Sequence, residues 1–215
     1  MGELEFDLVK GSITLKQEKD IDEIIKQLVP KNLVGMFSDQ VQQYRFMNQV
    51  KILKKVKEIC EINNLEPRQV APKFLLKFLE KSGLEENADL QERWANLMVN
   101  QSMNTNVDIY YMDILDKLEP IDAVILEQCF HSNINTRETV LLRDLTEYMN
   151  KEGRKIEEFR IKIIIRKLIS LQLFNTGVSE GVMVDGDEYL VDTVDNFRWS
   201  ELGIDFMKKI QKIDI

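Results

Sequence analysis

Residues 67–98 read PRQVAPKFLLKFLEKSGLEENADLQERWANLM and predict two helices separated by an acidic loop. Pro67 or Pro72 can begin the first helix, because proline in the first turn loses no hydrogen bond that the helix would have made. Gly83 ends that helix. Four apolar residues of the second helix recur at the spacing of one helical face: Leu90, Trp94, Leu97 and Met98. This stripe predicts a helix whose tryptophan lies in the core of a bundle.

Helices are also expected on both sides of this stretch. A helix that begins near Ser38 has five apolar residues on one face: Ile52, Leu53, Val56, Ile59 and Cys60. Asn63 and Asn64 can end it, because asparagine tolerates the left-handed conformation in which helices often end. Pro120 can begin a further helix. Four or five packed helices before residue 119 predict a small bundle.

The chain changes character near residue 119. Three helices are expected first, at about 120–130, at 139–150 and at 156–170, with a turn at Gly153. Two strands are expected next, at 171–178 and 188–194, because both are rich in the β-branched and aromatic residues that favour strands. The loop between them holds Gly181 and the turn pair Asp185-Gly186. Ser200 then precedes a short closing helix as an N-cap residue, and this order resembles a winged helix-turn-helix.

The predicted fold class is therefore mainly α, with a helical bundle domain followed by a winged-helix-like α+β module. The domain bounds are 1–37 for an N-terminal segment with a short helix, 38–118 for the bundle and 119–215 for the winged-helix-like module. Pro30 ends the short helix of the N-terminal segment.

Composition and charge exclude several classes of protein. The 215 residues are 44% hydrophobic and 31% charged, which is typical of a folded, helix-rich chain. No apolar run reaches the roughly 18–20 residues of a membrane span, and the N-terminus lacks a secretion signal, so we expect a cytoplasmic protein that does not enter the membrane. The net charge of −8 opposes general affinity for nucleic acid, because such binding needs a basic surface.

No catalytic or metal-binding pattern is found. His131, Cys60 and Cys129 do not have zinc-ligand spacing, and we expect His131 to be a capping or surface residue and both cysteines to be buried thiols. Signatures of nucleophilic hydrolases and phosphate-binding loops are missing from the sequence. We expect Asp113 and Asp116 to face water, the acidic residues between 180 and 195 to be solvated, and the methionines to lie in the core. The sequence thus predicts a protein that is not an enzyme and has no cofactor or metal.

The helix at 156–170 carries the one charge pattern that indicates a binding surface. Its four cations are predicted to lie on one broad face: Arg160, Lys162, Arg166 and Lys167. A DNA-reading helix presents such a face to the major groove. Against DNA, Glu157 and Glu158 stand at the end that usually contacts bases, and residues 172–197 contain no Lys or Arg. An acidic wing is repelled by phosphates, so protein recognition, packing or dimerisation is favoured over DNA binding.

Residues 67–98, followed by YMDILDKLEPIDAVIL at 111–126, resemble the Abi-alpha family of bacterial abortive-infection proteins. The matching positions are Pro72, Leu90, Trp94, Ala95, Asn96, Leu97, Leu115, Leu118, Pro120, Asp122 and Ala123. The resemblance covers about residues 40–130 closely and the rest of the chain more loosely. It implies a cytoplasmic protein of phage defence, in a family whose molecular activity is largely undefined and whose motifs supply no catalytic residue.

Two main hypotheses follow. The first is a non-enzymatic binding protein of phage defence that acts through a protein partner of unknown identity. This hypothesis is compatible with a homodimer of the chain. The alternative is a winged-helix transcriptional regulator whose basic helix reads DNA. A third hypothesis, a metal-dependent nuclease with scattered carboxylates, has no grouping of residues to support it.

Overall fold

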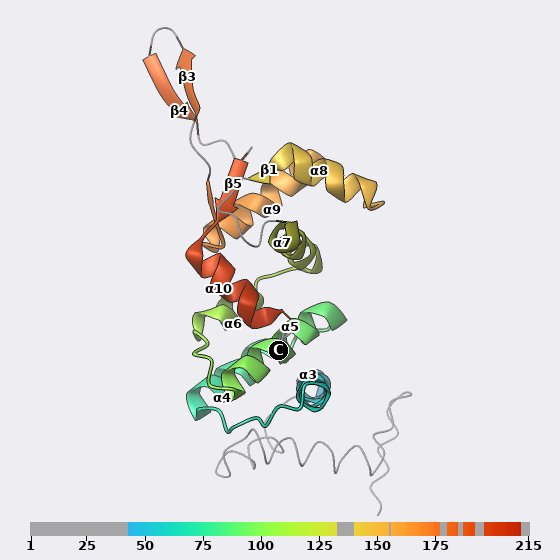
Figure 1. The fold of residues 1–215 in the computed structure, drawn as a ribbon. Coiled ribbons are helices and arrows are strands. Elements are labelled where there is room, and N and C mark those ends of the chain that lie inside the picture. Colours follow the sequence, from blue (N-terminus) through green and yellow to red (C-terminus); the bar gives the residue numbers. More distant parts are fainter. Residues whose placement is uncertain are drawn as a thin grey trace, which may run out of the picture. The chain divides into compact units, whose positions relative to one another are not determined.

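The computed structural model describes residues 43–132, 140–154, 156–176, 180–184, 187–191 and 196–211. The short helix expected before Pro30 and the helix start expected near Ser38 lie outside these residues. The described chain is mainly helical with a small three-stranded antiparallel sheet, so the mainly α prediction is confirmed (Figure 1). It divides into two compact units, Met1–Lys117 with Ile210–Ile215 (unit 1) and Leu118–Lys209 (unit 2).

Unit 1 contains four described helices. They are α3 (Gln43–Ile62), α4 (Pro72–Ser82), α5 (Ala88–Ser102) and α6 (Tyr110–Leu115). α5 packs against α3, and α4 contacts both α3 and α6. The apolar face predicted for α3 is buried at Ile52, Leu53 and Val56. The stripe predicted for α5 is also confirmed, because all four of its residues are at most 1% exposed.

The helix ends of unit 1 follow from short-range chemistry. α3 ends before Asn64, whose φ of 50° is left-handed, and Pro72 occupies the first turn of α4. Gly83 does follow α4, but its φ of −65° is right-handed. A Cβ atom there would lie 3.1 Å from the carbonyl oxygen of Leu79. Glycine is therefore favoured at this position by a close approach of neighbouring atoms and not by backbone conformation.

Trp94 lies in the core of unit 1, as predicted. It is 1% exposed, and its indole meets the Phe78 ring edge-on with the ring centroids 5.4 Å apart. An unexpected feature of the same helix is the burial of polar side chains, including Asn96 and Asn100. Asn96 Nδ2 donates a hydrogen bond to the Ile210 carbonyl oxygen at 3.1 Å. This bond joins residues far apart in sequence, which explains why helical periodicity did not reveal it.

Unit 2 also contains four described helices. They are α7 (Pro120–Ser132), α8 (Leu142–Lys151), α9 (Glu158–Ser170) and α10 (Glu201–Ile210). Gly153, with a φ of 77°, makes the predicted turn after α8. The helix predicted at 139–150 begins later than expected, because Val140 and Leu141 form a strand instead. None of the described helices has both the length and the apolar character needed to cross a membrane.

The strands of unit 2 differ from the prediction of two. β1 (Val140–Leu141), β5 (Asn196–Trp199) and β2 (Phe174–Thr176) form an antiparallel sheet in the order β1-β5-β2. β3 (Glu180–Val184) and β4 (Asp187–Val191) form a separate hairpin (Figure 1). Gly181, expected in a loop, is therefore in β3, paired with Leu190. β5 was missed because its strand pairs with two partners distant in sequence, on either side of it.

Hydrogen bonds connect the start of α10 with the residues just before β2. Ser200 is the expected N-cap, since its Oγ accepts a hydrogen bond from Gly203 N at 2.8 Å. The Ser200 backbone N–H donates to the Leu173 carbonyl oxygen at 3.1 Å. Three aromatic side chains of β2 and β5 pack together beside this junction: Phe174, Phe197 and Trp199. The aromatic contacts and the capping bonds hold α10 and the sheet together within unit 2.

Candidate functional site

The candidate site is the outer face of α9. The inner face of this helix is apolar and buried, at Ile161, Ile164, Ile165 and Leu168. α9 packs against α8 and β2 within unit 2. Because residues at i, i+3, i+4 and i+7 share one side of a helix, burial of these four positions turns the remaining side chains of α9 outward.

The structure separates the four cations that the sequence placed on one face. Arg160 and Arg166 are exposed, and neither guanidinium forms an ion pair with a described residue. Lys162 is half-buried, and its Nζ lies 3.5 Å from Glu158 Oε1, one turn earlier. Lys167 Nζ lies 2.6 Å from Asp122 Oδ2, on α7. Two arginines thus remain exposed and outside any described ion pair, while Lys167 joins two helices.

Asp122 explains the position of Lys167. Its side chain is 1% exposed, and a buried carboxylate requires a compensating charge or hydrogen bonds. It has both, since the Glu119 backbone N–H also donates to Asp122 Oδ2 at 2.7 Å. That bond is the half of a capping box in which the third helical residue reaches back to the residue before the helix. Asp122 therefore caps α7 and binds α9 at once.

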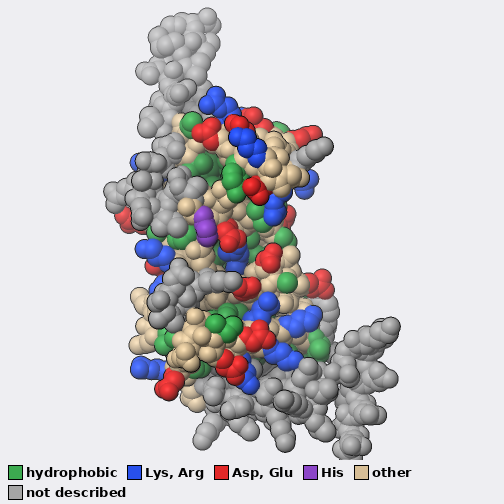
Figure 2. Space-filling view, turned by 45° about the vertical axis from the view of Figure 1, so that its right-hand side comes forward, with side chains coloured by type: hydrophobic (Ala, Val, Ile, Leu, Met, Phe, Trp, Pro, Cys, Tyr) green, Lys and Arg blue, Asp and Glu red, His purple; other side chains and the backbone are tan. Residues whose placement is uncertain are grey.

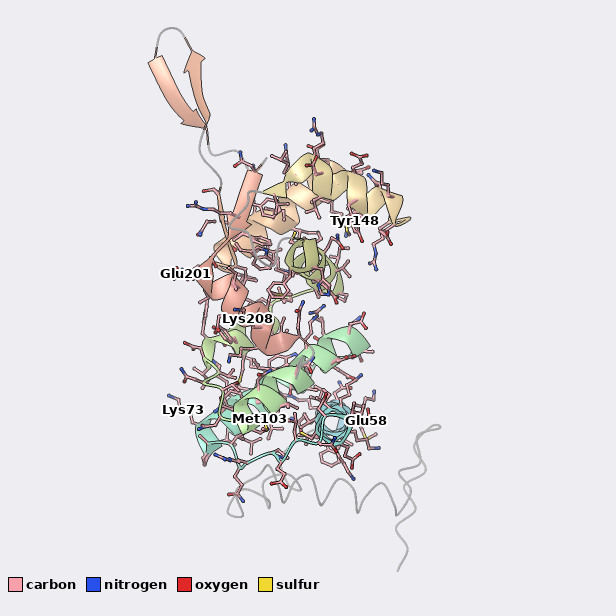
Figure 3. The ribbon with its side chains drawn as sticks, in the orientation of Figure 1. Glu58, Lys73, Met103, Tyr148, Glu201 and Lys208 are labelled. Atoms are coloured by element: carbon pink, nitrogen blue, oxygen red, sulfur yellow. The ribbon has the colours of Figure 1, made fainter. Side chains whose placement is uncertain are left out.

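Apolar side chains lie between the cations on the outer face, which the charge pattern did not reveal. Phe159 is 68% exposed and Ile163 is 49% exposed. A signal was present in the sequence, because these two apolar residues stand four apart on the side opposite the buried isoleucines. Elsewhere in unit 2, Tyr148 of α8 is 39% exposed (Figure 3). Large apolar side chains are thus exposed on unit 2, two of them next to the exposed arginines of α9.

The charges at the start of α9 are mixed and not uniformly basic. Glu157 and Glu158 stand exposed at the start of α9, before Arg160. Across the face of the molecule in Figure 2, positive and negative side chains of the described residues are interspersed. Such a surface does not provide the continuous positive stripe that tracks a nucleic-acid backbone.

The candidate chemical groups in the described chain are in unreactive surroundings. Cys60 and Cys129 are buried, as predicted, and burial raises the pKa of the Cys129 thiol to about 12. A thiol with such a pKa is a poor nucleophile at neutral pH. His131 is exposed at the end of α7, with Nδ1 3.1 Å from the Glu127 carbonyl oxygen. Within the described ranges, no three His, Cys, Asp or Glu side chains group as metal ligands.

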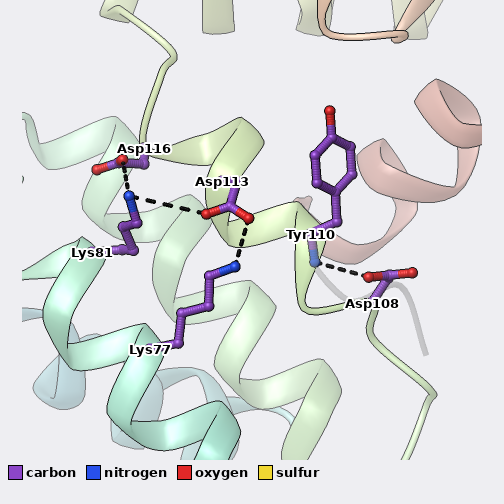
Figure 4. A network of polar contacts seen from close by, with 6 residues as sticks. All are labelled: Lys77, Lys81, Asp108, Tyr110, Asp113 and Asp116. Carbon is purple, nitrogen blue, oxygen red and sulfur yellow. Dashed lines mark hydrogen bonds and ion pairs between the residues drawn. The ribbon is translucent and has the colours of Figure 1, made fainter.

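Two carboxylates at the end of α6, Asp113 and the C-cap residue Asp116, make contacts that the sequence did not reveal. Asp113 and Asp116 were expected to face water, and they are partly exposed and exposed, respectively; both also meet lysines of α4 (Figure 4). Lys77 Nζ lies 2.5 Å from Asp113 Oδ2, and Lys81 Nζ lies 2.8 Å from Asp116 Oδ2. The hydrogen bond from Lys81 to Asp116 raises the pKa of Lys81. Alternating charges therefore attach α6 to α4, and this arrangement is an ion-pair ladder and not an acid–base pair.

Comparison with known proteins gives one match. The family model described as abortive infection alpha matches residues 42–209. No curated protein and no solved structure gives a significant match. The matched region includes every described helix and strand except Ile210, the last residue of α10, and it includes the whole of α9.

Proposed function

Since the chain belongs to the abortive infection alpha family, we propose that it is a non-enzymatic, cytoplasmic binding protein of bacterial phage defence that acts through a protein partner. The family match extends over most of the chain and supports the defence role. The binding mechanism rests on physical arguments from α9, which follow.

A winged-helix fold of unit 2 is part of this proposal. Support comes from the element order, in which α7, α8 and α9 precede the strands β2 to β5 and α10. The short strand β1, between α7 and α8, pairs with β5 of the same sheet. In helix-turn-helix proteins, the helix at the position of α9 is the one presented to the target. The proposal therefore assigns recognition to the outer face of α9.

The observation that carries the proposal is the exposure of Phe159 and Ile163 beside Arg160 and Arg166. An aromatic side chain that is 68% exposed loses water-accessible apolar area when a partner covers it, and such burial is favourable. Aromatic residues and arginine are also enriched at protein–protein interfaces. This combination suits a protein partner better than it suits a phosphate backbone.

DNA binding is the alternative, and the exposed Arg160 and Arg166 favour it. Both can contact phosphates or guanine edges. The opposing features are Glu157 and Glu158 at the start of the helix and the apolar Phe159 next to them. Because affinity for DNA depends on phosphate contacts, a regulator should bind a duplex at low salt and lose affinity steeply as salt rises.

The experiment that tests the proposal is phage plating on bacteria that express the protein or its variants. Arg160→Ala with Arg166→Ala should abolish protection, whereas Arg68→Ala with Lys73→Ala, two exposed cations of unit 1, should retain it. Cellular protein level and thermal unfolding are measured in parallel, since exposed charges contribute little to stability. Full protection by the α9 variant would refute the role of this face.

Duplex DNA binding by the purified chain separates the two hypotheses. The protein-partner proposal expects no binding at low salt. Binding that decreases steeply with salt and disappears in the Arg160→Ala, Arg166→Ala variant would instead establish the regulator.

A further inference from the structure

We propose that the outer face of α9 recognises one kind of partner segment: an amphipathic protein segment whose apolar side chains are bordered by carboxylates. This inference rests on the proposed function and specifies the chemistry of the partner. It follows from the order in which apolar and cationic side chains occur along the exposed side of the helix.

The geometry of α9 places these side chains in one line. Phe159, Ile163 and Arg166 stand at i, i+4 and i+7, and at 3.6 residues per turn they fall within about 60° of one another. The four buried residues of α9 occupy the opposite side. The most outward line of the helix therefore begins with two apolar side chains and ends with a guanidinium. An elongated apolar ridge of this kind matches the anchors used when a helix is recognised by a groove or by another helix.

The charges border the ridge and determine the sign of the partner. Arg160 lies at one edge, Lys162 at the other and Arg166 at the C-terminal end, all at least partly exposed. Glu158 lies 3.5 Å from Lys162 and offsets that cation. Complementary charges favour association and like charges oppose it. A partner that covers Phe159 and Ile163 must therefore bring carboxylates toward Arg160 and Arg166.

Two other occupants fit less well. A second copy of the chain would bring the same cationic edges together, which is unfavourable for two uncompensated arginines on each face. A DNA major groove would meet Phe159 and Ile163 in the half of the helix that normally supplies hydrogen bonds to base edges. Neither side chain has a hydrogen-bonding group. An acidic amphipathic segment satisfies both the apolar ridge and its cationic border.

The test uses the full chain and a labelled synthetic helical peptide, with leucines at i, i+4 and i+7 bordered by glutamates. Three probes serve as controls: the same peptide with lysines in place of the glutamates, the same peptide with serines in place of the leucines, and a short DNA duplex. Fluorescence anisotropy measures binding of each probe. We expect only the acidic leucine peptide to bind, with an affinity that decreases moderately as salt rises.

Variants locate the binding to the ridge and its border. Phe159→Ala and the pair Arg160→Ala, Arg166→Ala should each weaken binding of the acidic peptide about tenfold or more, as for central interface residues. Leu76→Ala and Lys73→Ala on α4 are matched controls of unit 1, exposed in the same way, and should leave binding unchanged. All variants are checked for an unchanged unfolding temperature.

The outcomes distinguish this inference from the proposed function. Absence of binding by the acidic peptide, equal binding by the lysine or serine peptide, or binding unaffected by the α9 variants overturns the inference. Tighter binding of the DNA duplex does so as well. If phage protection is still lost in the Arg160→Ala, Arg166→Ala variant, the role of the face stands and only the partner chemistry is wrong.

Discussion

Trp94 illustrates, at the scale of a residue, how a helical stripe becomes a core. It is 1% exposed and packs against Phe78, with which it forms an edge-on ring contact. Large apolar side chains at such positions contribute through their buried area and through the cavity that their removal would leave.

Trp94→Ala should therefore reduce the free energy of unfolding by roughly 3–5 kcal/mol. The control is Leu76→Ala on α4, a side chain that is 43% exposed, whose loss should cost less than about 1 kcal/mol. Chemical denaturation followed by circular dichroism measures both. A loss below about 1 kcal/mol for Trp94→Ala would contradict its burial and make it a candidate binding residue.

Close packing within unit 2 leaves no room for a side chain at Gly203. A Cβ atom at this position would lie 2.1 Å from the Leu173 carbonyl oxygen, which is backbone and cannot turn away. Gly203→Ala should cost about 1–3 kcal/mol or more, as expected for overpacking. Gly153→Ala is the matched control, because its site is open but has a φ of 77°, and it should cost about 1 kcal/mol. A smaller loss at Gly203 than at Gly153 would show that α10 shifts freely.

At the scale of the element, the contact between α7 and α9 depends on the bond of Asp122 with Lys167. The lysine is 30% exposed and the carboxylate 1% exposed, so removing the lysine leaves a buried charge with one hydrogen bond fewer. Lys167→Ala should cost about 1–3 kcal/mol, and Arg166→Ala, its exposed neighbour, less than about 0.5 kcal/mol. Thermal and denaturant unfolding measure the difference.

The double variant Asp122→Asn, Lys167→Ala completes that test. If the two side chains interact, the double variant should lose less stability than the sum of the single variants. Additive losses would mean that the contact contributes nothing to stability. Arg160, Lys162 and Arg166 are at least partly exposed, so their replacement by alanine should leave the fold intact, whereas replacement of Lys167 should not be neutral.

In unit 1, as in unit 2, ion pairs join helices that are far apart in the sequence. The ladder between α4 and α6 pairs residues that are 35 or 36 positions apart in the chain. The sequence placed Asp113 and Asp116 toward water, and both are at least partly exposed, but it did not show that they meet lysines of α4. A charge pattern reports which side of a helix a group occupies, but not which helix it faces.

At the scale of the whole molecule, each compact unit contains one of the two tryptophans, Trp94 in unit 1 and Trp199 in unit 2. Trp94→Phe and Trp199→Phe therefore give single-tryptophan proteins whose fluorescence reports one unit each. Gly203→Ala, added to both, should lower the unfolding midpoint reported by Trp199 more than the midpoint reported by Trp94. Equal shifts of the two midpoints would indicate that both units unfold together in one cooperative transition.

The sequence by itself determined the mainly helical class, the helix ends at Asn64 and Pro72, the burial of Trp94 and the cap at Ser200, and its motifs identified the family. These features depend on neighbours a few residues away, which periodicity and capping describe. Only the tertiary structure decided that β1 and β5 are strands and that Lys167 meets Asp122. Those features depend on pairing between distant segments, whose contacts are set by how the elements pack and not by their local sequence.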